Sequence, residues 1–369
     1  MGENNRKLKI AEFVTSEVSF PIPSDFPRVY APLEIALAVA GGLSRRGHEI
    51  VFFGPRGSAS STFKAFDVDV VPLYKNEILE GLTRGIEREK IFSLFDQYIV
   101  SSIFEEHQKR PFDILHIHPI DRVLPFARLF RDTHIVYTLH DPIFPWRAEV
   151  FRMFASPNQH LVSISNAQRS PAPDLNYLAT IYNGIAVDDI PFSDKGKGEY
   201  LLFMGRLHAE KGVAEAVEVA LKAGEKLIIA GPPVTDEHWD TKVKPYLGEQ
   251  IKYIGVVRGE ERYEYYRNAK ATLVPIQWEE PFGMVMIESM VCGTPVIAFR
   301  RGSVPEIVVH GKTGFIVDTV EEMVQVVKNR IGEISRKECR DHVRENFDIE
   351  RMINGYEEHF LSLARGIRS

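Results

Sequence analysis

Apolar and polar residues in the first half of the chain alternate between short apolar runs and longer amphipathic segments. Short apolar runs that end in turn residues predict strands, and apolar residues three and four positions apart predict helices. Strands are expected at residues 8–14, 49–53, 69–72, 114–117, 135–138, 161–164 and 179–181. Helices are expected at residues 33–46 and 77–108, the second broken near Gly85. Strands that alternate with helices in this way predict βαβ units and a parallel sheet.

The same pattern starts again after a polar, glycine-containing segment at residues 188–198, which we interpret as a hinge or linker. Further strands are expected at residues 200–204, 226–230, 251–254, 271–274 and 295–298. Helices are expected at residues 214–223 and 283–291, and a long terminal helix at 349–365. The pattern therefore predicts two Rossmann-like domains side by side, and it leaves open which of them the terminal helix joins.

Composition and charge exclude several classes of protein. The chain has 369 residues, of which 44% are hydrophobic and 26% charged, as in globular proteins of two domains. A net charge of −6 predicts no binding to nucleic acid. The longest apolar stretch, residues 31–43, is too short to cross a membrane and contains Glu34. Residues 1–9 lack the apolar core of a signal peptide, and two cysteines form no disulfide framework, so we expect a cytoplasmic protein.

The most specific motif spans residues 278–288, where a predicted strand leads through a turn into a helix that begins near Gly283. Free amides at a helix N-terminus, with the helix dipole behind them, favour an anion. Glu280 stands at the helix entrance, where a carboxylate can face a sugar. Glu288 follows about two turns later and can bind ribose hydroxyls. The alternative is a capping carboxylate followed by a surface glutamate.

A second motif spans residues 203–212, where a predicted strand ends at Gly205 and a short loop leads into a helix. Arg206 and Lys211 flank this loop. Cations at the carboxyl end of a strand, beside a helix N-terminus, can grip a diphosphate. The alternative is a set of exposed salt bridges.

Three histidines lie near strand ends in the first half of the chain. His140 precedes the turn pair Asp141-Pro142, and it is either a structural histidine or a residue of a cleft between the domains, where open α/β sheets bind ligands. His116 and His118 share one face of a strand end. Because the sequence shows no third ligand, we predict no metal site and interpret the pair as a polar strand end that faces a cleft.

Taken together, six short motifs make the chain resemble a known enzyme family. They are Thr138-Leu-His140, Ser163-Ile-Ser165, Tyr182-Asn-Gly-Ile185, Gly205-Arg206 with Lys211-Gly212, Glu280-Pro-Phe-Gly283 through Glu288, and Cys292-Gly-Thr-Pro-Val296. These motifs resemble those of the glycosyltransferases group 1, the retaining family 4 glycosyltransferases of GT-B fold. Residues 173–177 and 276–282 are most similar to the branch that includes avilamycin-pathway glycosyltransferases.

The resemblance implies two Rossmann-like domains that face each other across a cleft. Residues 1–187 would form the acceptor-side domain, joined by a C-terminal helix (350–369) that crosses back to it, and residues 188–349 would bind the nucleotide sugar. The implied reaction moves a hexose from a nucleotide diphosphate sugar, of UDP or GDP type, to a hydroxyl acceptor with retention, as in glycan biosynthesis. It needs neither a metal nor another cofactor. Peripheral contact with a lipid acceptor stays open, although residues 77–108 mix acidic and basic groups and do not indicate binding to an anionic membrane.

The resemblance also assigns roles to single residues. Arg206 and Lys211 would bind the diphosphate, Glu288 the ribose, and Glu280 and His140 the donor sugar from opposite domains. The remaining donor-binding residues would be Gly205, Gly231, Val256, Val257, Phe282, Gly283 and Met284.

One segment departs from the family pattern. Many relatives carry a glycine pair in the first βα loop, where this chain has Tyr30-Ala31-Pro32, and Gly41-Gly42 lies too far into the following helix to replace it. A bulkier loop could reshape the acceptor site or reduce the activity. Two alternatives stay open. One is another enzyme of the same fold, a nucleotide-sugar epimerase or a sugar phosphorylase, and the other is a non-catalytic nucleotide-sugar-binding protein, which the altered loop slightly favours.

Overall fold

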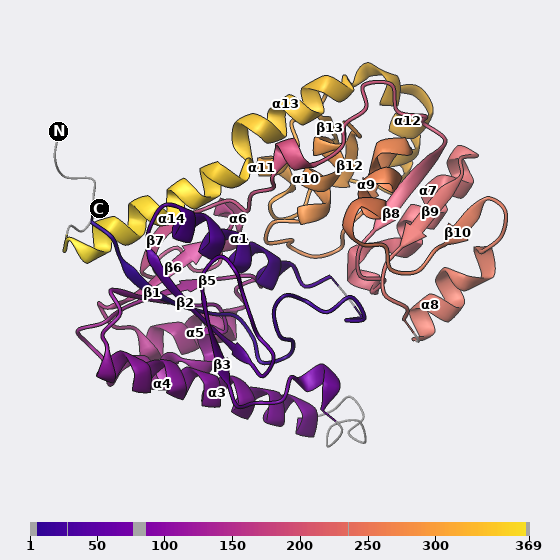
Figure 1. The fold of residues 1–369 in the computed structure, drawn as a ribbon. Helices are drawn as coiled ribbons and strands as arrows, with labels where there is room; N and C mark the ends of the chain where they lie inside the picture. The colour runs from indigo at the N-terminus through magenta and orange to yellow at the C-terminus, as the bar shows by residue number, and fades with distance from the viewer. Residues whose placement is uncertain (1–5, 28, 77–85, 235, 367–369) are drawn as a thin grey trace, which may run out of the picture.

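A computed structural model describes residues 6–27, 29–76, 86–234 and 236–366. The chain forms two lobes, each built on its own parallel sheet flanked by helices (Figure 1). The predicted α/β fold with two Rossmann-like domains is confirmed.

The N-terminal lobe is built on a sheet of seven parallel strands in the order β3-β2-β1-β4-β5-β6-β7. The strands are β1 (Lys9–Phe13), β2 (Glu49–Pro55), β3 (Lys64–Val68), β4 (Ile114–Ile117), β5 (His134–Thr138), β6 (Gln159–Ser163) and β7 (Tyr177–Thr180). The strand order reverses between β1 and β4, where Glu12 lies beside His116 in the register. In open α/β sheets, ligands bind outside the carboxyl ends of the strands at this reversal.

Helices cover both faces of this sheet. On one face lie α1 (Ala31–Arg45) and the C-terminal helix α14 (Ile349–Ala364), which share an apolar core with β1 and β2. The opposite face carries α3, α4 and α5. The remaining helices of the lobe are α3 (Ile86–Lys109), α4 (Leu124–Ala127), α5 (Pro145–Phe154) and α6 (Asn166–Arg169). Figure 1 shows α14 in yellow along the N-terminal lobe, so the terminal helix does cross back to the first domain.

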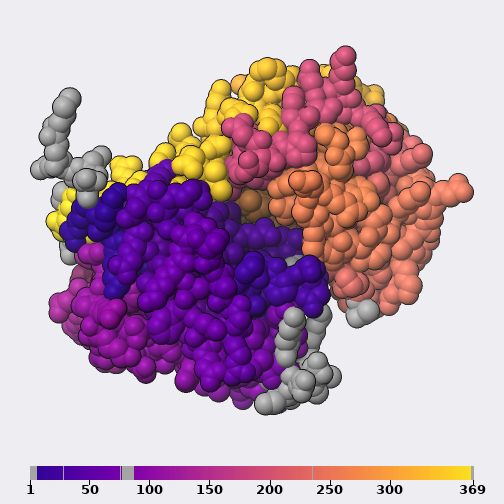
Figure 2. All heavy atoms as spheres, in the orientation of Figure 1, coloured from indigo at the N-terminus to yellow at the C-terminus, as the bar shows by residue number. Residues whose placement is uncertain are grey.

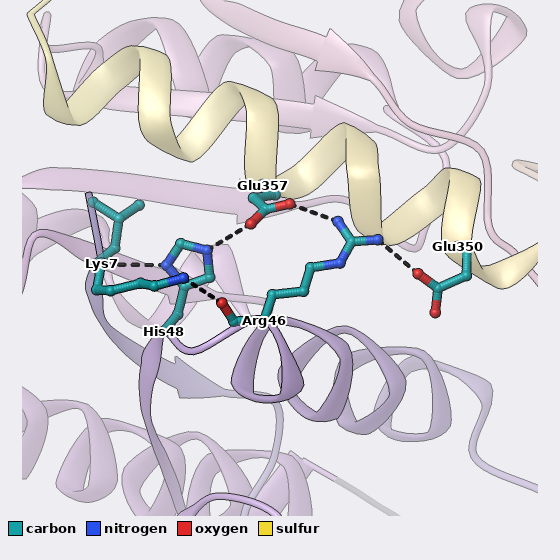
Figure 3. A network of polar contacts seen from close by, with 6 residues as sticks. Lys7, Arg46, His48, Glu350 and Glu357 are labelled. Carbon is teal, nitrogen blue, oxygen red and sulfur yellow. Dashed lines mark hydrogen bonds and ion pairs between the residues drawn. The ribbon is translucent and has the colours of Figure 1, made fainter. Parts of the chain in front are cut away.

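Polar contacts hold α14 on the N-terminal lobe (Figure 3). The Arg46 guanidinium pairs with the carboxylates of Glu350 and Glu357, both at 2.6 Å. His48 bonds Glu357 Oε1 through Nε2 at 2.9 Å, and its Nδ1 accepts the Leu8 amide hydrogen. Gly42 lets the two helices approach closely, because a Cβ there would collide with Ile353 of α14. Gly42 of the glycine pair therefore serves helix packing.

The C-terminal lobe has a sheet of six parallel strands in the order β10-β9-β8-β11-β12-β13, reversing between β8 and β11. The strands are β8 (Tyr200–Met204), β9 (Leu227–Ala230), β10 (Ile251–Tyr253), β11 (Ala269–Val274), β12 (Val296–Phe299) and β13 (Gly314–Val317). The helices are α7 (Val213–Ala223), α8 (Glu237–Lys242), α9 (Gly259–Asn268), α10 (Met284–Val291), α11 (Val304–Ile307), α12 (Val320–Asn329) and α13 (Arg336–Asn346).

The chain passes between the lobes twice, and the two crossings lie side by side. Ile185 donates its amide hydrogen to Phe347 O at 2.9 Å and accepts one from Ile349 at 3.0 Å. Nearby, the Glu306 carboxylate accepts the amide hydrogens of Asn166 and Ala167 at the start of α6. The lobes also touch away from these crossings, where Arg258 donates to Ser24 O at 2.7 Å. In the space-filling view, the indigo and purple lobe meets the orange and salmon lobe across a groove (Figure 2).

Most predicted elements are found, and the exceptions are local. The prediction of a strand at residues 69–72 is wrong. The third strand is β3, a partly exposed strand at the edge of the sheet, and Pro72 has no amide hydrogen for a ladder. The strand β13 was not predicted: it has only four residues, and the helix before it, α11, is a single short turn. Strand β2 continues through Gly54 and Pro55, which we expected to end it. The predicted helix break near Gly85 lies outside the described residues.

None of the described helices is both long enough and apolar enough to cross a membrane. The cytoplasmic location stays a prediction, as do the domain boundaries at residues 187 and 349.

Candidate active site

A cleft lies between the two lobes, at the carboxyl ends of the central strands of both sheets. The N-terminal lobe contributes Ala31, Pro32, Ile35, His140, Ile164 and Asn183 to its wall. The C-terminal lobe contributes Phe203, Met204, Gly205, Arg206, Lys211, Leu273, Val274, Ile276, Glu280, Phe282, Gly283, Met284 and Val285. The cleft therefore brings together eight of the predicted site residues: His140, Gly205, Arg206, Lys211, Glu280, Phe282, Gly283 and Met284.

The two predicted cations lie in the loop that follows β8. Arg206 is half exposed, and its guanidinium lies 3.6 Å from the Glu210 carboxylate. Lys211 is more buried and donates from Nζ to Glu280 Oε2 at 2.5 Å. Its ammonium also lies 4.3 Å from the ring centre of Trp278, which favours a cation. Two positive groups thus face the cleft, one exposed and one held by a carboxylate and an aromatic ring.

Glu280 lies four residues before the first residue of α10, and several contacts fix its position. Its Oε2 accepts the Nζ hydrogen of Lys211 and the indole hydrogen of Trp278, the latter at 2.9 Å. Its backbone carbonyl accepts the amide hydrogen of Ser303 at 2.9 Å. The Ser303 hydroxyl donates to Phe282 O at 2.7 Å. Sequence reasoning missed Ser303, although a Gly-Ser pair just before Val304-Pro305 is typical of a helix start.

The helix α10 begins one residue after Gly283, which has a left-handed backbone with φ of 81°. A Cβ at this position would meet Met286 Cε at 2.7 Å and Glu280 Cγ at 3.3 Å. The first amides of the helix, from Met284 onward, have no carbonyl one turn earlier within it. Since Met284 and Val285 line the cleft, the positive end of the helix dipole points into it.

Glu288 lies in the second turn of α10 but does not line the cleft. Its side chain is buried, and its Oε2 accepts the Tyr266 hydroxyl hydrogen at 3.0 Å. Its Oε1 lies 3.3 Å from the Arg262 guanidinium. Arg262 also lies 3.9 Å from Glu34 of α1, so it links the second glutamate of the motif to the N-terminal lobe. Neither Arg262 nor Tyr266 could be predicted as a partner from the motif, because both come from α9.

The three remaining predicted residues, Gly231, Val256 and Val257, are also absent from the cleft wall. They lie beyond the ends of β9 and β10, next to the loop that carries Gly205. Gly231 donates its amide hydrogen to Gly255 O at 2.8 Å and accepts one from the Tyr253 hydroxyl at 3.0 Å.

The atypical first βα loop lies at the cleft. Tyr30 precedes α1, and Ala31 and Pro32 form its first turn and line the cleft opposite Glu280 and Met284. Asn183, from the Tyr182-Asn-Gly-Ile185 motif, also lines the cleft. Its buried Oδ1 has no hydrogen-bond partner among the described residues. This wall offers apolar surface and a free acceptor.

His140 also lines the cleft, and a buried polar cluster lies behind it. His140 Nε2 is 2.7 Å from His118 Nδ1, and His118 Nε2 is 2.8 Å from Glu12 Oε1. His116 lies on the other side of Glu12, with Nδ1 3.0 Å from Oε2. Burial and, to a smaller extent, the His116 ring lower the pKa of His140 to about 3, so its imidazole is neutral. The predicted cleft role of His140 has the position it needs.

The prediction that His116 and His118 face the cleft is wrong. Both are buried beneath His140, because the fully buried Glu12 draws them inward through hydrogen bonds. Within the described part of the chain, Glu12, His116 and His118 form a group whose potential metal ligands all lie within 4.8 Å of one another. Each of these side chains already makes hydrogen bonds within the cluster, which therefore needs no metal to satisfy its polar atoms.

Comparisons with known proteins agree with this arrangement. Residues 188–346 match the family glycosyl transferases group 1. An uncharacterised 41.2 kDa protein from the cps region of Klebsiella pneumoniae is 25% identical over 310 residues, which cover 74% of this chain and 84% of that protein. The N-acetyl-α-D-glucosaminyl L-malate synthase of Bacillus anthracis is 22% identical over 92% of this chain and 96% of its own length.

Solved structures share the fold over nearly the whole chain. Sucrose-phosphate synthase from Thermosynechococcus elongatus superposes with a TM-score of 0.78 at 18% identity, covering 98% of this chain and all of the other. AviGT4, a glycosyltransferase of avilamycin A biosynthesis, gives 0.72 at 22% identity over 97% and 98% of the two chains. Anabaena HepE in complex with UDP and glucose gives 0.68 at 16% identity over 96% of this chain and all of its own. The match to the avilamycin branch is one of fold, and the branch stays a prediction. The family glycosyl transferases group 1 is thus matched over residues 188–346 of the C-terminal lobe, and nearly the whole chain has the GT-B fold of these glycosyltransferases.

Proposed function

We propose that this glycosyltransferase moves a hexose from a nucleotide diphosphate sugar to a hydroxyl acceptor, with retention at the anomeric carbon and without a metal. The observation that carries the proposal is the convergence of Arg206, Lys211 and the N-terminus of α10 on one wall of the cleft. Two cations and a helix dipole that converge on one point suit a diphosphate. The complex of HepE with UDP and glucose supports a nucleotide-sugar donor for a chain of this fold.

In this proposal, departure of the diphosphate is the step that the C-terminal wall assists. The leaving group gains negative charge as the bond to the anomeric carbon breaks, and preorganised cations and dipoles stabilise that charge. Lys211 gives one hydrogen to Glu280 and keeps two for phosphate oxygens. Arg206 is half exposed and can turn toward the second phosphate. These groups carry the charge without a cation from solution.

Glu280 has the role of positioning the sugar rather than attacking it. Its Oε2 is held by Lys211 and Trp278, and a carboxylate that is paired with an ammonium at 2.5 Å is a weak nucleophile. We therefore favour attack by the acceptor hydroxyl from the same face that the diphosphate leaves. The hydroxyl proton passes to the departing phosphate oxygen, so that the acceptor oxygen–carbon bond replaces the phosphate oxygen–carbon bond.

The other donor contacts of the proposal come from the resemblance to the family. The nucleoside would lie beyond the ends of β8 to β10, beside Gly205, Gly231, Val256 and Val257. Glu288 would bind the ribose after its carboxylate exchanges part of its contact with Arg262 for the sugar hydroxyls. His140 and Asn183 would face sugar hydroxyls from the N-terminal wall, where both are neutral.

Thermal-shift screening with UDP, GDP and ADP and their sugars tests the donor class. A ligand that binds only the folded state raises the free energy of unfolding by RT ln(1 + [L]/Kd). A true donor should therefore raise the melting temperature, and the rise should grow with the logarithm of the donor concentration once this exceeds Kd. The stabilising donor is then incubated with hydroxyl acceptors, and the anomeric configuration of the product is determined by NMR. Isomerised donor without an acceptor would indicate an epimerase, and stabilisation without turnover a binding protein. A product with inverted configuration would contradict retention.

A further inference from the structure

A continuous chain of hydrogen bonds runs from the C-terminal helix to the cleft. It starts at the Tyr356 hydroxyl, 2.9 Å from Thr138 Oγ1, which is 2.8 Å from His116 Nε2. Glu12 joins His116 to His118, and His118 reaches His140 at 2.7 Å. All of these side chains except His140 are buried. The His140 Nδ1 makes no hydrogen bond with the described residues and is the end of the chain at the cleft.

With Glu12 ionised and the three imidazoles neutral, one arrangement of protons satisfies every bond. The carboxylate only accepts, so His116 donates to it from Nδ1 and His118 from Nε2. The second nitrogen of each ring must then accept. His118 Nδ1 therefore accepts the Nε2 hydrogen of His140, which leaves His140 Nδ1 as an acceptor at the cleft.

The other branch is fixed in the same way. His116 Nε2 accepts the Thr138 hydroxyl hydrogen, and Thr138 Oγ1 accepts that of Tyr356. The hydrogen of each buried hydroxyl thus has an acceptor.

Adding one proton to Glu12 reverses only the branch that leads to the cleft. The new carboxyl hydrogen can be donated to His118 or to His116. Donation to His116 would turn its Nε2 into a donor and leave a buried hydroxyl hydrogen of Thr138 or Tyr356 without an acceptor, which costs free energy. Donation to His118 moves a hydrogen to its Nδ1, so that His140 accepts at Nε2 and donates at Nδ1.

We propose that Glu12, acting through His118, is a positioning residue that sets whether His140 accepts or donates a hydrogen bond at the cleft. In the ionised state His140 presents an acceptor to a hydroxyl of the bound sugar, and in the protonated state it presents a donor. The role at the sugar rests on the proposed function, whereas the proton arrangement depends only on the cluster.

The electrostatics place the exchangeable proton on Glu12. Burial raises the pKa of its carboxyl to about 7, against the hydrogen bond and charge of His118. Burial also lowers the pKa of His116 and His118 to about 3, as it does for His140. Among the described residues, the other titratable groups near these side chains are Tyr356 from α14 and, lining the same cleft as His140, Arg206, Lys211 and Glu280. The first proton taken up between pH 8 and 6 therefore forms a neutral carboxyl rather than an imidazolium.

The variant Glu12→Gln imitates the protonated state. Its amide nitrogen can donate to His118 while its oxygen accepts from His116, and the opposite orientation would again leave a buried hydroxyl hydrogen unpaired. We expect His140 in this variant to carry its hydrogen on Nδ1 at every pH. Tyr356→Phe is the matched control, because it removes the far end of the same chain and leaves the branch to the cleft intact.

The test is ¹⁵N NMR of histidine-labelled full-length protein between pH 5.5 and 8.5, with the His140 signals assigned by their loss in His140→Asn. We expect the wild type and Tyr356→Phe to change from the Nδ1–H to the Nε2–H form of His140 as the pH rises, and Glu12→Gln to stay Nδ1–H. A His140 tautomer that does not change with pH in the wild type, or that changes equally in Glu12→Gln, would overturn the proposal. So would a stoichiometric metal in the purified protein that binds this cluster.

Kinetics give a second readout that a purely structural role would not move. With a true donor, kcat of the wild type should fall about tenfold from pH 8 to pH 6, and that of Glu12→Gln should stay near the lower value throughout. An unchanged pH profile in Glu12→Gln would contradict the role at the sugar. If NMR shows the expected change of the His140 tautomer but the protein has no transferase activity, the proton switch is supported and the proposed function is rejected.

Discussion

The two walls of the cleft differ in charge and in how they are built. The C-terminal wall carries Arg206, Lys211 and Glu280, while the N-terminal residues that line the cleft carry no charge near neutral pH. Arg206 and Glu280 lie on loops and Lys211 on a 3₁₀ turn, and of the three Arg206 is the most exposed. The polar groups of the N-terminal side lie behind His140 in a buried chain of hydrogen bonds. Under the proposed function, the charged part of the donor would bind to the C-terminal wall, and the opposite wall would select neutral hydroxyl groups.

Removing the cations should produce the largest effect on turnover. Lys211→Ala should lower kcat about 10²–10³-fold, because it removes a preorganised positive group from the departing diphosphate. The measurement is steady-state kinetics with the donor found by the nucleotide-sugar screen. Arg300→Ala is the control, since Arg300 is an exposed cation of the same lobe that pairs with Asp318 outside the cleft. Equal losses in the two variants would show that the effect is one of overall charge.

The buried carboxyl of Glu12 should make the free energy of unfolding depend on pH. The pKa of Glu12 is about 7 in the folded protein and 4.5 in the unfolded chain. Below pH 4.5 both states hold the proton. As the pH rises, the unfolded chain loses it first, so the free energy of unfolding falls by up to roughly 3 kcal/mol by the time the folded pKa is passed.

Glu12→Gln removes this contribution. The difference in free energy of unfolding, variant minus wild type, should therefore increase by roughly 3 kcal/mol between about pH 4.5 and pH 8. This change with pH does not depend on how stable the variant is at any one pH. Urea denaturation at both ends of this range measures the change. Tyr356→Phe should keep the wild-type slope, and parallel curves for Glu12→Gln and the wild type would disprove the buried, high-pKa carboxyl.

The two glutamates of the 278–288 motif should separate in kinetics. Glu280→Gln should lower kcat at least tenfold, about 1.4 kcal/mol, because Glu280 orients the sugar as its anomeric carbon becomes cationic. Glu288→Gln should mainly raise the donor KM, because a ribose contact is the same in the ground and transition states. Steady-state kinetics with the true donor measure both. The reverse pattern would mean that the two roles are exchanged.

A smaller effect is expected far from the cleft, where α14 is held on the N-terminal lobe (Figure 3). Glu357→Gln should lower the free energy of unfolding by about 1 kcal/mol, because Arg46 and His48 lose a partly buried carboxylate partner. Glu358→Gln, at an exposed position of the same helix, should change it little. Nucleotide affinity should be unchanged in both variants. A loss of affinity in Glu357→Gln would show that α14 is coupled to the donor site.

Sequence patterns were most informative about the C-terminal wall. Its main residues lie in two short segments, 203–212 and 278–288, each with a strand end followed by a helix start. The carboxyl ends of parallel strands lie at the same edge of a sheet, so residues in these two segments are expected to lie close together in space. The partners of Glu288 could not be predicted in this way, because Arg262 and Tyr266 belong to α9, which lies outside both segments.

The N-terminal side could not be predicted in the same way. Glu12 and His116 are 104 residues apart, and Thr138 and Tyr356 are 218 apart. They meet because β1 pairs with β4 in one register and because α14 returns to the first lobe. A shift of one residue in that register would turn either side chain to the other face of the sheet. The sequence therefore shows separate histidines, and the structure shows the hydrogen bonds that connect them through Glu12.

We propose that the C-terminal wall binds the diphosphate and that the buried hydrogen-bond chain behind the other wall does not. The decisive experiment is isothermal titration of the stabilising nucleotide diphosphate into three proteins: the wild type, Arg206→Ala/Lys211→Ala and Glu12→Gln. We expect the double variant to lose at least a hundredfold in affinity while it keeps the wild-type melting temperature within a few degrees. Glu12→Gln should bind within twofold of the wild type. Unchanged affinity in the double variant, or an equal loss in Glu12→Gln, would contradict this division between the two walls.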